Sequence, residues 1–206
     1  MKYLLLINGL KRSGKDHSTN KIISYVGEEN SKRISFASPI KQIIAETFNI
    51  KLNDLEDYKN NIDSFGIEIK EYQDNQADSI IKYIDFRTIL QRFGTEAMKP
   101  IFGNNVWAKK AIDMVIDNKK EWNIITDFRF LSEYEESKKA SKKYNFELIT
   151  INIINEDLPF SDTHASEMEL KDNNFEFDFV INNTGQPNID NQIKNIIENL
   201  RVKIIS

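Results

Sequence analysis

The sequence predicts an α/β fold in which a parallel sheet carries helices on both faces. Short apolar stretches alternate with amphipathic stretches along the chain, which is the order expected of repeated strand–helix units. Two glycines, Gly9 and Gly14, follow the first apolar stretch, at the point where such a sheet turns into its first helix. No linker interrupts the 206 residues, so we expect one domain spanning residues 1–206.

Five apolar stretches predict the strands, and the first of them ends at the turn-forming residues Asn8 and Gly9. The predicted strands are residues 2–7, 32–36, 122–126, 147–154 and 177–181. Stretches with helical periodicity predict the helices, one of which opens with Ser38 followed by Pro39. The predicted helices are residues 14–26, 38–48, 84–98, 105–119, 133–144 and 189–202.

Two polar segments do not follow this alternation. Residues 51–81 are rich in Asn, Asp, Glu and Lys with weak periodicity, and we interpret them as an insertion of short helices and loops. The helix after the insertion is expected to end before Pro100, because the residue before a proline disfavours helical backbone. Residues 155–174, between the last two predicted strands, contain few apolar side chains.

Composition narrows the function classes. Hydrophobic residues make up 40% and charged residues 29%, which is ordinary for a soluble globular protein. A net charge of -4 argues against binding a nucleic-acid polymer, which usually requires a basic excess. The apolar stretch 4–7 is too short to cross a membrane and lacks a signal-peptide layout, so we expect a cytoplasmic protein (host cytoplasm if a phage encodes it). With no cysteine, disulfides, thiolate metal sites and a cysteine nucleophile are excluded.

Residues 9–15 match the phosphate-binding loop pattern G-x-x-x-x-G-K, between the first strand and the first helix. Glycines let successive backbone N–H groups point at phosphate oxygens, and the helix N-terminus behind them adds its positive dipole end. The alternative is a chance glycine pair in a strand-to-helix turn. The candidate ligands of the phosphates are Gly9, Lys11, Arg12, Ser13, Gly14 and Lys15.

The residues after this loop leave alternatives open. Asp16 stands where Ser or Thr is usual, and its carboxylate suits Mg²⁺, held directly or through water. Alternatively, Ser18 or Thr19 lies near the phosphates, one helical step further on. His17 is either a helix-surface residue or a ligand contact.

An acid and an arginine follow the third predicted strand. Asp127 stands where the second carboxylate of a phosphate-loop site usually contacts the metal or its waters. Arg129 can pair with a phosphate through its forked guanidinium group. The alternative for both is a solvated Asp–Arg turn.

Three further residues are candidates for binding an acceptor. Arg87 and Gln91 are four apart and share a helix face, which offers a phosphate ligand and an amide able to recognise a base edge; the alternative is an exposed helix with ordinary charges. Trp107 is either a core anchor or a wall of the nucleoside pocket.

The polar segment after residue 154 lies where small kinases place a lid that closes over the phosphates, and we expect a lid at residues 155–170. His164 either contacts the ligand from this lid or flanks a short helix. Residues 155–169 contain no arginine, so the positive charge has to come from elsewhere, such as Arg129 or Arg12.

Four stretches together resemble one family, the bacteriophage deoxynucleoside monophosphate kinases. They cover most of the chain apart from residues 51–80. The stretches are residues 9–16, residues 87–96 with Trp107 downstream, residues 125–130 with Glu133, and residues 164–167.

The resemblance implies a three-layer P-loop NTPase fold like that of adenylate kinase, with an acceptor-binding helical region at about 38–100. It implies transfer of the γ-phosphate of ATP, with Mg²⁺, to a deoxynucleoside 5'-monophosphate. The implied catalytic residues are Lys15, Arg87, Asp127 and Arg129. The implied acceptor ligands are Ala37, Ser38, Lys41, Arg87 and Gln91, while Asn183 and Gly185 would lie near the adenine of ATP.

Two other functions stay open. One is a P-loop kinase for another small acceptor, such as a dephospho-coenzyme A-like molecule or a nucleoside. The other is a non-catalytic nucleotide-binding switch, because residues 118–121 are similar to a guanine-recognition motif, although they precede a strand. The expected partners are small molecules, and a homodimer is possible because related kinases can be dimeric.

Overall fold

The computed structural model of the chain describes residues 1–10, 12–52, 54, 66–71, 80–155, 169–183 and 188–202. The chain forms two compact units. We call residues 1–36 together with 108–206 the sheet unit, and residues 37–107 the inserted unit. The bounds of the inserted unit are close to those expected for the acceptor-binding region.

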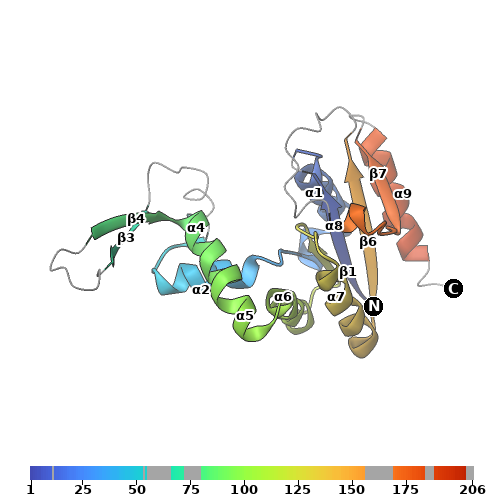
Figure 1. Cartoon of the computed structure of the whole chain (residues 1–206). Helices are drawn as coiled ribbons and strands as arrows, with labels where there is room; N and C mark the ends of the chain where they lie inside the picture. The colour runs from blue at the N-terminus through green and yellow to red at the C-terminus, as the bar shows by residue number, and fades with distance from the viewer. Residues whose placement is uncertain are drawn as a thin grey trace. The chain divides into compact units, whose positions relative to one another are not determined.

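The sheet unit contains five parallel strands, which confirms the predicted α/β fold with a parallel sheet (Figure 1). Their spatial order is β2-β5-β1-β6-β7. Because all strands run in the same direction, their carboxyl ends meet at one edge of the sheet, where ligands bind in such folds. The strands are β1 Lys2–Gly9, β2 Ser31–Ile34, β5 Trp122–Ile125, β6 Phe146–Ile154 and β7 Phe179–Asn182.

The central strand β1 is buried on both faces. Alternate residues of a strand point to opposite faces, so Tyr3, Leu5 and Ile7 belong to one core cluster, while Leu4 and Leu6 belong to another. All five side chains are at most 1% exposed. This double burial explains why the stretch is apolar throughout instead of alternating with polar residues.

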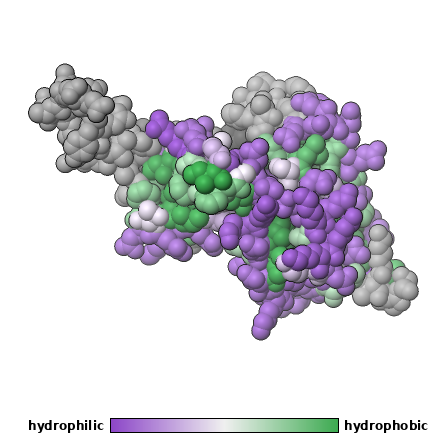
Figure 2. Space-filling model, turned by 60° about the horizontal axis from the view of Figure 1, so that its bottom comes forward, coloured by the Kyte–Doolittle hydropathy of each residue, from purple (hydrophilic) through white to green (hydrophobic). Residues whose placement is uncertain are grey.

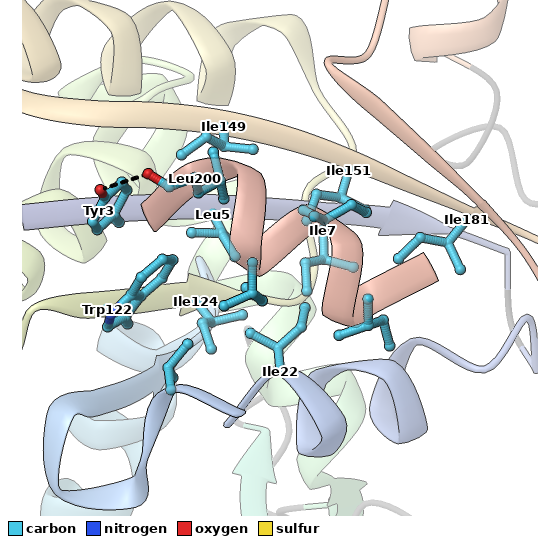
Figure 3. Close-up of a cluster of buried hydrophobic side chains, with 14 of the residues drawn as sticks. Tyr3, Leu5, Ile7, Ile22, Trp122, Ile124, Ile149, Ile151, Ile181 and Leu200 are labelled. Atoms are coloured by element: carbon cyan, nitrogen blue, oxygen red, sulfur yellow. Dashed lines mark hydrogen bonds between the residues drawn. The ribbon is translucent and has the colours of Figure 1, made fainter. Parts of the chain in front are cut away.

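Helices cover both faces of the sheet and make a three-layer unit. On one face pack α1 (Lys15–Val26) and α9 (Asn188–Val202), and Figure 3 shows Ile22 and Leu200 beside side chains of the sheet. The opposite face packs against α6 (Val106–Asp117), α7 (Leu131–Tyr144) and the short α8 (Glu169–Asp172). A 3-10 turn, η1 (Glu28–Asn30), leads into β2. None of the helices that the structure describes is long and apolar enough to cross a membrane.

The surface of the described residues is mainly hydrophilic in the view of Figure 2, with hydrophobic residues gathered in smaller areas. Exposed large hydrophobic side chains include Ile101 and Phe102 of the inserted unit and Val180 of β7. Single exposed apolar side chains are normal on a folded protein.

The inserted unit combines helices with a two-stranded antiparallel sheet. Its core cluster consists of Ile40, Ile44, Phe86 and Trp107. A π-helical segment, η2, lies between two α-helical ones. The elements are α2 Ser38–Thr47, β3 Gly66–Glu71, β4 Ile80–Asp85, α4 Phe86–Gln91, η2 Arg92–Met98 and α5 Lys99–Phe102.

Two sequence-based expectations for this unit hold only in part. The region 51–81, expected to hold short helices and loops, contains β3 and the start of β4, whose pairing places Gly66 opposite Asp85. Its Ile residues alternate with charged ones in β3, a strand pattern that the polar composition obscured. The helix expected at 84–98 begins at Phe86, because the Asp85 carboxylate caps it by accepting the Thr88 N–H at 3.0 Å.

The helical backbone also continues past Pro100 instead of ending before it. Pro100 lies in the first turn of α5, a position at which proline is tolerated. The short α8 was not predicted either, and it lies in the polar segment between the last two strands.

The ammonium group of Lys2 closes the C-terminus of α6. Its Nζ donates to the carbonyl oxygens of Val115 at 2.8 Å, Ile116 at 3.2 Å and Asn118 at 2.7 Å. These carbonyls lack partners within the helix, and the helix dipole favours a cation there.

Replacing Lys2 by Met should therefore lower the free energy of unfolding by about 1–2 kcal/mol, since the helix end loses its hydrogen bonds and its counter-charge. Urea unfolding followed by circular dichroism measures this change. Lys32→Met, at an exposed position of β2, is the matched control. Equal effects of the two variants would show that the contact with α6 contributes nothing.

Candidate functional site

The candidate site lies at the carboxyl edge of the sheet, entirely within the sheet unit. The loop after β1 joins Gly9 to α1, Asp127 follows β5, and Asn183 follows β7. Three segments that are far apart in the sequence therefore reach one edge of the sheet.

The backbone of the phosphate loop requires its two glycines. Gly9 has φ 150° and Gly14 has φ 99°, a region that favours glycine. A Cβ on Gly9 would lie 2.6 Å from the carbonyl oxygen of Ile153 and 2.6 Å from Oγ of Ser13. Between them, Arg12 has φ 67°, which is uncommon for a long side chain and is found most often at functional sites.

Lys15, the first residue of α1, directs its ammonium group back over the loop. Nζ donates to the carbonyl oxygen of Leu10 at 2.7 Å and also to that of Gly9. The cation is thus held at the mouth of the loop by two carbonyl dipoles. In this position it is available to a phosphate group bound by the loop.

Ser13 supplies a direct test of whether the loop fits a phosphate. The side chain is 1% exposed, and Oγ has no hydrogen-bond partner among the residues that the structure describes. A buried hydroxyl group without a partner costs about 1–3 kcal/mol. A phosphate oxygen would remove that cost, and the N-terminus of α1 would add its partial positive charge. The loop therefore fits an anionic phosphate ligand.

Asp127 connects two strand ends. Its Oδ1 accepts the backbone N–H of Phe36, just beyond β2, at 2.7 Å. Next to it, the Asn8 side chain at the end of β1 donates to the carbonyl oxygen of Phe128 at 2.8 Å. These bonds fix the segment after β5 against the neighbouring strands. Asp127 lies at the strand end as predicted, and its metal-binding role stays a prediction.

Asp16 points toward β2. Its carboxylate forms an ion pair with Arg33, and the Asp16 side chain is 82% exposed. An exposed ion pair of this kind is weak, so it competes little with a metal ion. In the described parts of the chain, no group of three or more acidic or histidine side chains could hold a metal. Mg²⁺ in proteins usually uses one or two carboxylates together with substrate phosphates, so Asp16 and Asp127 each have a suitable chemistry, and their role as metal ligands stays a prediction.

Glu133 is a buried acid in the first turn of α7. Its Oε2 accepts the backbone N–H groups of Arg129 at 2.8 Å and Phe130 at 3.0 Å. Burial is the main cause that raises the pKa of Glu133 to about 8, and the charge of Asp127 adds to it, while the two N–H donors oppose it. Next in the chain, the Leu131 N–H donates to Glu169 at 2.9 Å. Two acids therefore hold the backbone that carries Arg129.

Sequence reasoning missed this capping role of Glu133. Glu133 was named only among the residues that resemble the phage kinases, although an acid in the first turn of a helix is a known capping signal. The hydrogen bonds of the Asn8 and Asn183 side chains were missed too. An amide at the end of a strand gives no local sign of a partner that is distant in the sequence.

Other predicted ligands in the sheet unit lie in less direct positions. His17 is exposed on α1, and its Nε2 lies 3.8 Å from Oδ1 of Asp190 in α9. Ser18 is fully buried, and Thr19 donates through Oγ1 to the carbonyl oxygen of Lys15 at 2.8 Å. Lys11, His164 and Gly185 lie outside the described residues, as does most of the predicted lid.

The remaining candidate residues belong to the inserted unit, and their positions are given within that unit. Ala37, Ser38 and Lys41 lie at the start of α2. Arg87 lies in the first turn of α4, and Gln91 ends that helix with an exposed side chain.

Trp107 is 9% exposed, and its Nε1 donates to the carbonyl oxygen of Gly94 in η2 at 2.8 Å. This bond ties Trp107 to η2 within the core cluster of the inserted unit, so the geometry favours the core-anchor alternative for Trp107.

Glu133 should make stability depend on pH. Its pKa is about 8 in the folded protein, against an ordinary value of 4.5. Between these values the folded state keeps a proton that the unfolded state loses, so stability should fall as pH rises through this window. The expected fall is on the order of a few kcal/mol, since one pKa unit corresponds to about 1.4 kcal/mol.

Glu133→Gln carries no titrating proton at this position, so urea unfolding at pH 5 and pH 8.5 should show a shallower fall than in the wild type. Glu135→Gln, an exposed change in the same helix, is the control and should follow the wild type. A Glu133→Gln protein with the wild-type pH profile would contradict the assignment.

No protein-family model matches the chain, and no curated protein matches it. Among solved structures, a mutant of the APS kinase CysC of Mycobacterium tuberculosis is 9% identical, with 97% of both chains covered and a TM-score of 0.48. A candidate kinase from Chloroflexus aurantiacus is 10% identical, covering 98% of this chain and 97% of its own, with a TM-score of 0.49. A plasmid partition protein from Borrelia burgdorferi is 16% identical, with coverages of 96% and 97% and a TM-score of 0.36. Structural similarity at such low sequence identity does not indicate which substrate this chain uses.

Proposed function

We propose that this chain is a P-loop phosphotransferase that transfers the γ-phosphate of ATP to a deoxynucleoside 5'-monophosphate, releasing ADP and a deoxynucleoside diphosphate. The observation that carries the proposal is the loop at residues 9–15, in which Gly9 and Gly14 adopt glycine-favouring backbone and the Ser13 hydroxyl group is buried without a partner among the described residues. The Lys15 ammonium group above the loop supports the same function.

The roles follow from charge and position. The loop amides and Lys15 bind the phosphates of ATP, and Asp127 and Asp16 hold Mg²⁺ or its water ligands. When bound, Mg²⁺ neutralises charge on the phosphate groups during transfer. No general base is needed, because the acceptor phosphate is already an anion.

The proposed acceptor follows from a different part of the chain than the phosphotransferase chemistry. It depends on Arg87 and Gln91, which lie on one helix four residues apart, and on the resemblance to the phage kinases. Under this proposal Arg87 and Arg129 hold the acceptor phosphate. The other acceptor ligands would be Ala37, Ser38, Lys41 and His164.

The structure gives the switch alternative no support. Asn118, the first residue of the guanine-like motif, uses its side-chain amide to donate to the carbonyl oxygen of Met114 at 2.6 Å and to Oδ1 of Asn123 at 2.8 Å. Its own Oδ1 accepts the Lys120 N–H at 2.9 Å. The side chain therefore closes the end of α6, and its polar atoms are engaged within the protein.

An ADP-release assay with ATP and Mg²⁺ tests the acceptor. The panel contains dAMP, dCMP, dGMP, dTMP and 5-substituted pyrimidine monophosphates, each beside its ribonucleotide. We expect turnover well above the rate without acceptor on at least one deoxynucleotide, because the Arg87–Gln91 face suits a phosphate and a base. Silence on the whole panel, with ATP still bound, would remove this acceptor class and favour another small acceptor.

Lys15→Ala tests the phosphate chemistry directly. We expect turnover to fall by about a hundredfold or more, because the cation that balances charge on the transferred group is lost. Circular dichroism should show an unchanged fold, since the bonds described for the Lys15 ammonium group go to carbonyls of the loop. Lys194→Ala, on the exposed face of α9, is the matched control. Near-normal turnover in Lys15→Ala would refute the whole scheme.

A further inference from the structure

Asn183, the residue after β7, contacts the phosphate loop. Its backbone N–H donates to the carbonyl oxygen of Ile154 at 2.7 Å, which fixes the residue at the end of β6. Its side-chain Nδ2 donates to the carbonyl oxygen of Ser13 at 2.9 Å. The two partners of this second bond are 170 residues apart in the sequence. The last strand of the sheet therefore touches the loop that follows the first strand.

The contact extends to Gly14. A Cβ on Gly14 would lie 2.4 Å from Nδ2 of Asn183, so the amide packs directly against the glycine. Gly14 has φ 99°, and it immediately precedes α1. Any side chain at this position would displace the amide of Asn183, and the absence of one is what permits the bond to Ser13.

The bond to Ser13 determines which way a peptide group faces. In a planar trans peptide the C=O and N–H groups point in opposite directions. Because the Ser13 carbonyl oxygen is held toward Asn183, the N–H of Gly14 in the same peptide points away from Asn183. Backbone N–H groups of such loops are the donors that bind phosphate oxygens.

We propose that Asn183 is a positioning residue that holds the Ser13–Gly14 peptide in its phosphate-binding orientation. The inference rests on the phosphate-binding role proposed above for the loop. It differs from the expectation that Asn183 lies near the adenine, because it assigns the side-chain amide to the loop backbone and not to the base. Its effect on a nucleotide is therefore independent of the base.

The test uses two variants of the full chain. Asn183→Leu keeps the size of the side chain without its donor, and Asn183→Ala removes most of the side chain. Both variants lack the bond to Ser13, so the test needs only one of them to fold. Asn20→Ala, an exposed asparagine on α1, is the matched control. Calorimetry measures binding of ATP, GTP and inorganic tripolyphosphate to each protein, and thermal unfolding reports the fold.

We expect both variants to bind all three ligands about tenfold more weakly, the effect of one lost hydrogen bond that orients a donor. The preference for ATP over GTP should stay that of the wild type. In turnover, the KM for ATP should rise while the KM for the acceptor stays constant, which a general loss of stability would not produce.

Three results would overturn the inference. A changed ratio of ATP to GTP affinity with unchanged tripolyphosphate binding would place the side chain at the base. If the Asn183 variants bind all three ligands with the affinity of the wild type, the contact does not position the loop. A wild-type protein that binds none of them would refute the phosphate-binding role itself, whereas binding without transfer to any acceptor would refute only the proposed reaction.

Discussion

The double burial of β1 is the constraint on which the candidate site depends. This strand is hydrogen-bonded to β5 on one edge and to β6 on the other, and both of its faces lie in core clusters. A strand held in this way has no freedom to shift in register without exposing apolar side chains. The positions of its last residues, Asn8 and Gly9, are consequently fixed, and neighbouring segments of the sheet unit contact them. Asn8 bonds to the segment after β5, while Gly9 lies against Ile153 of β6.

The charges near the loop follow from this geometry. Three acids belong to the segments that follow strands of the sheet: Asp16 beside Lys15, Asp127 after β5, and Glu133 in the first turn of α7. A free negative charge close to a bound phosphate would be unfavourable. Asp127 accepts a backbone N–H from Phe36, and Asp16 pairs with Arg33. Glu133 is buried with a pKa raised to about 8, so it is mostly uncharged at neutral pH and repels a phosphate little. Each of these acids thus has a partner within the protein: a backbone N–H for Asp127, an arginine for Asp16 and two backbone N–H groups for Glu133.

The sequence predicted those parts that depend on local patterns. The strands, the flanking helices, the loop at 9–15 and the acid after β5 all have signals within a few residues. The β3–β4 hairpin was missed because a polar composition outweighed a short alternating pattern. The residues of η2 were expected to be α-helical, because a short π-helical stretch inside a helix is rare and gives no separate signal in the sequence. The contact of Asn183 with Ser13 could not be predicted, since it joins residues from opposite ends of the chain. The lid prediction at 155–170 falls mostly on residues that the structure does not describe.

The proposed reaction divides its tasks between separate parts of the sequence. Every bond described for the phosphate loop, including those to Lys15 and Asn183, is made within the sheet unit. Of the proposed acceptor ligands, Arg87 and Gln91 belong to the inserted unit, which has its own core around Phe86 and Trp107, whereas Arg129 belongs to the sheet unit. Substitutions of Arg87 or Gln91 change none of the bonds described for the loop. Under the proposed function, such substitutions should alter acceptor specificity while those bonds of the loop stay in place.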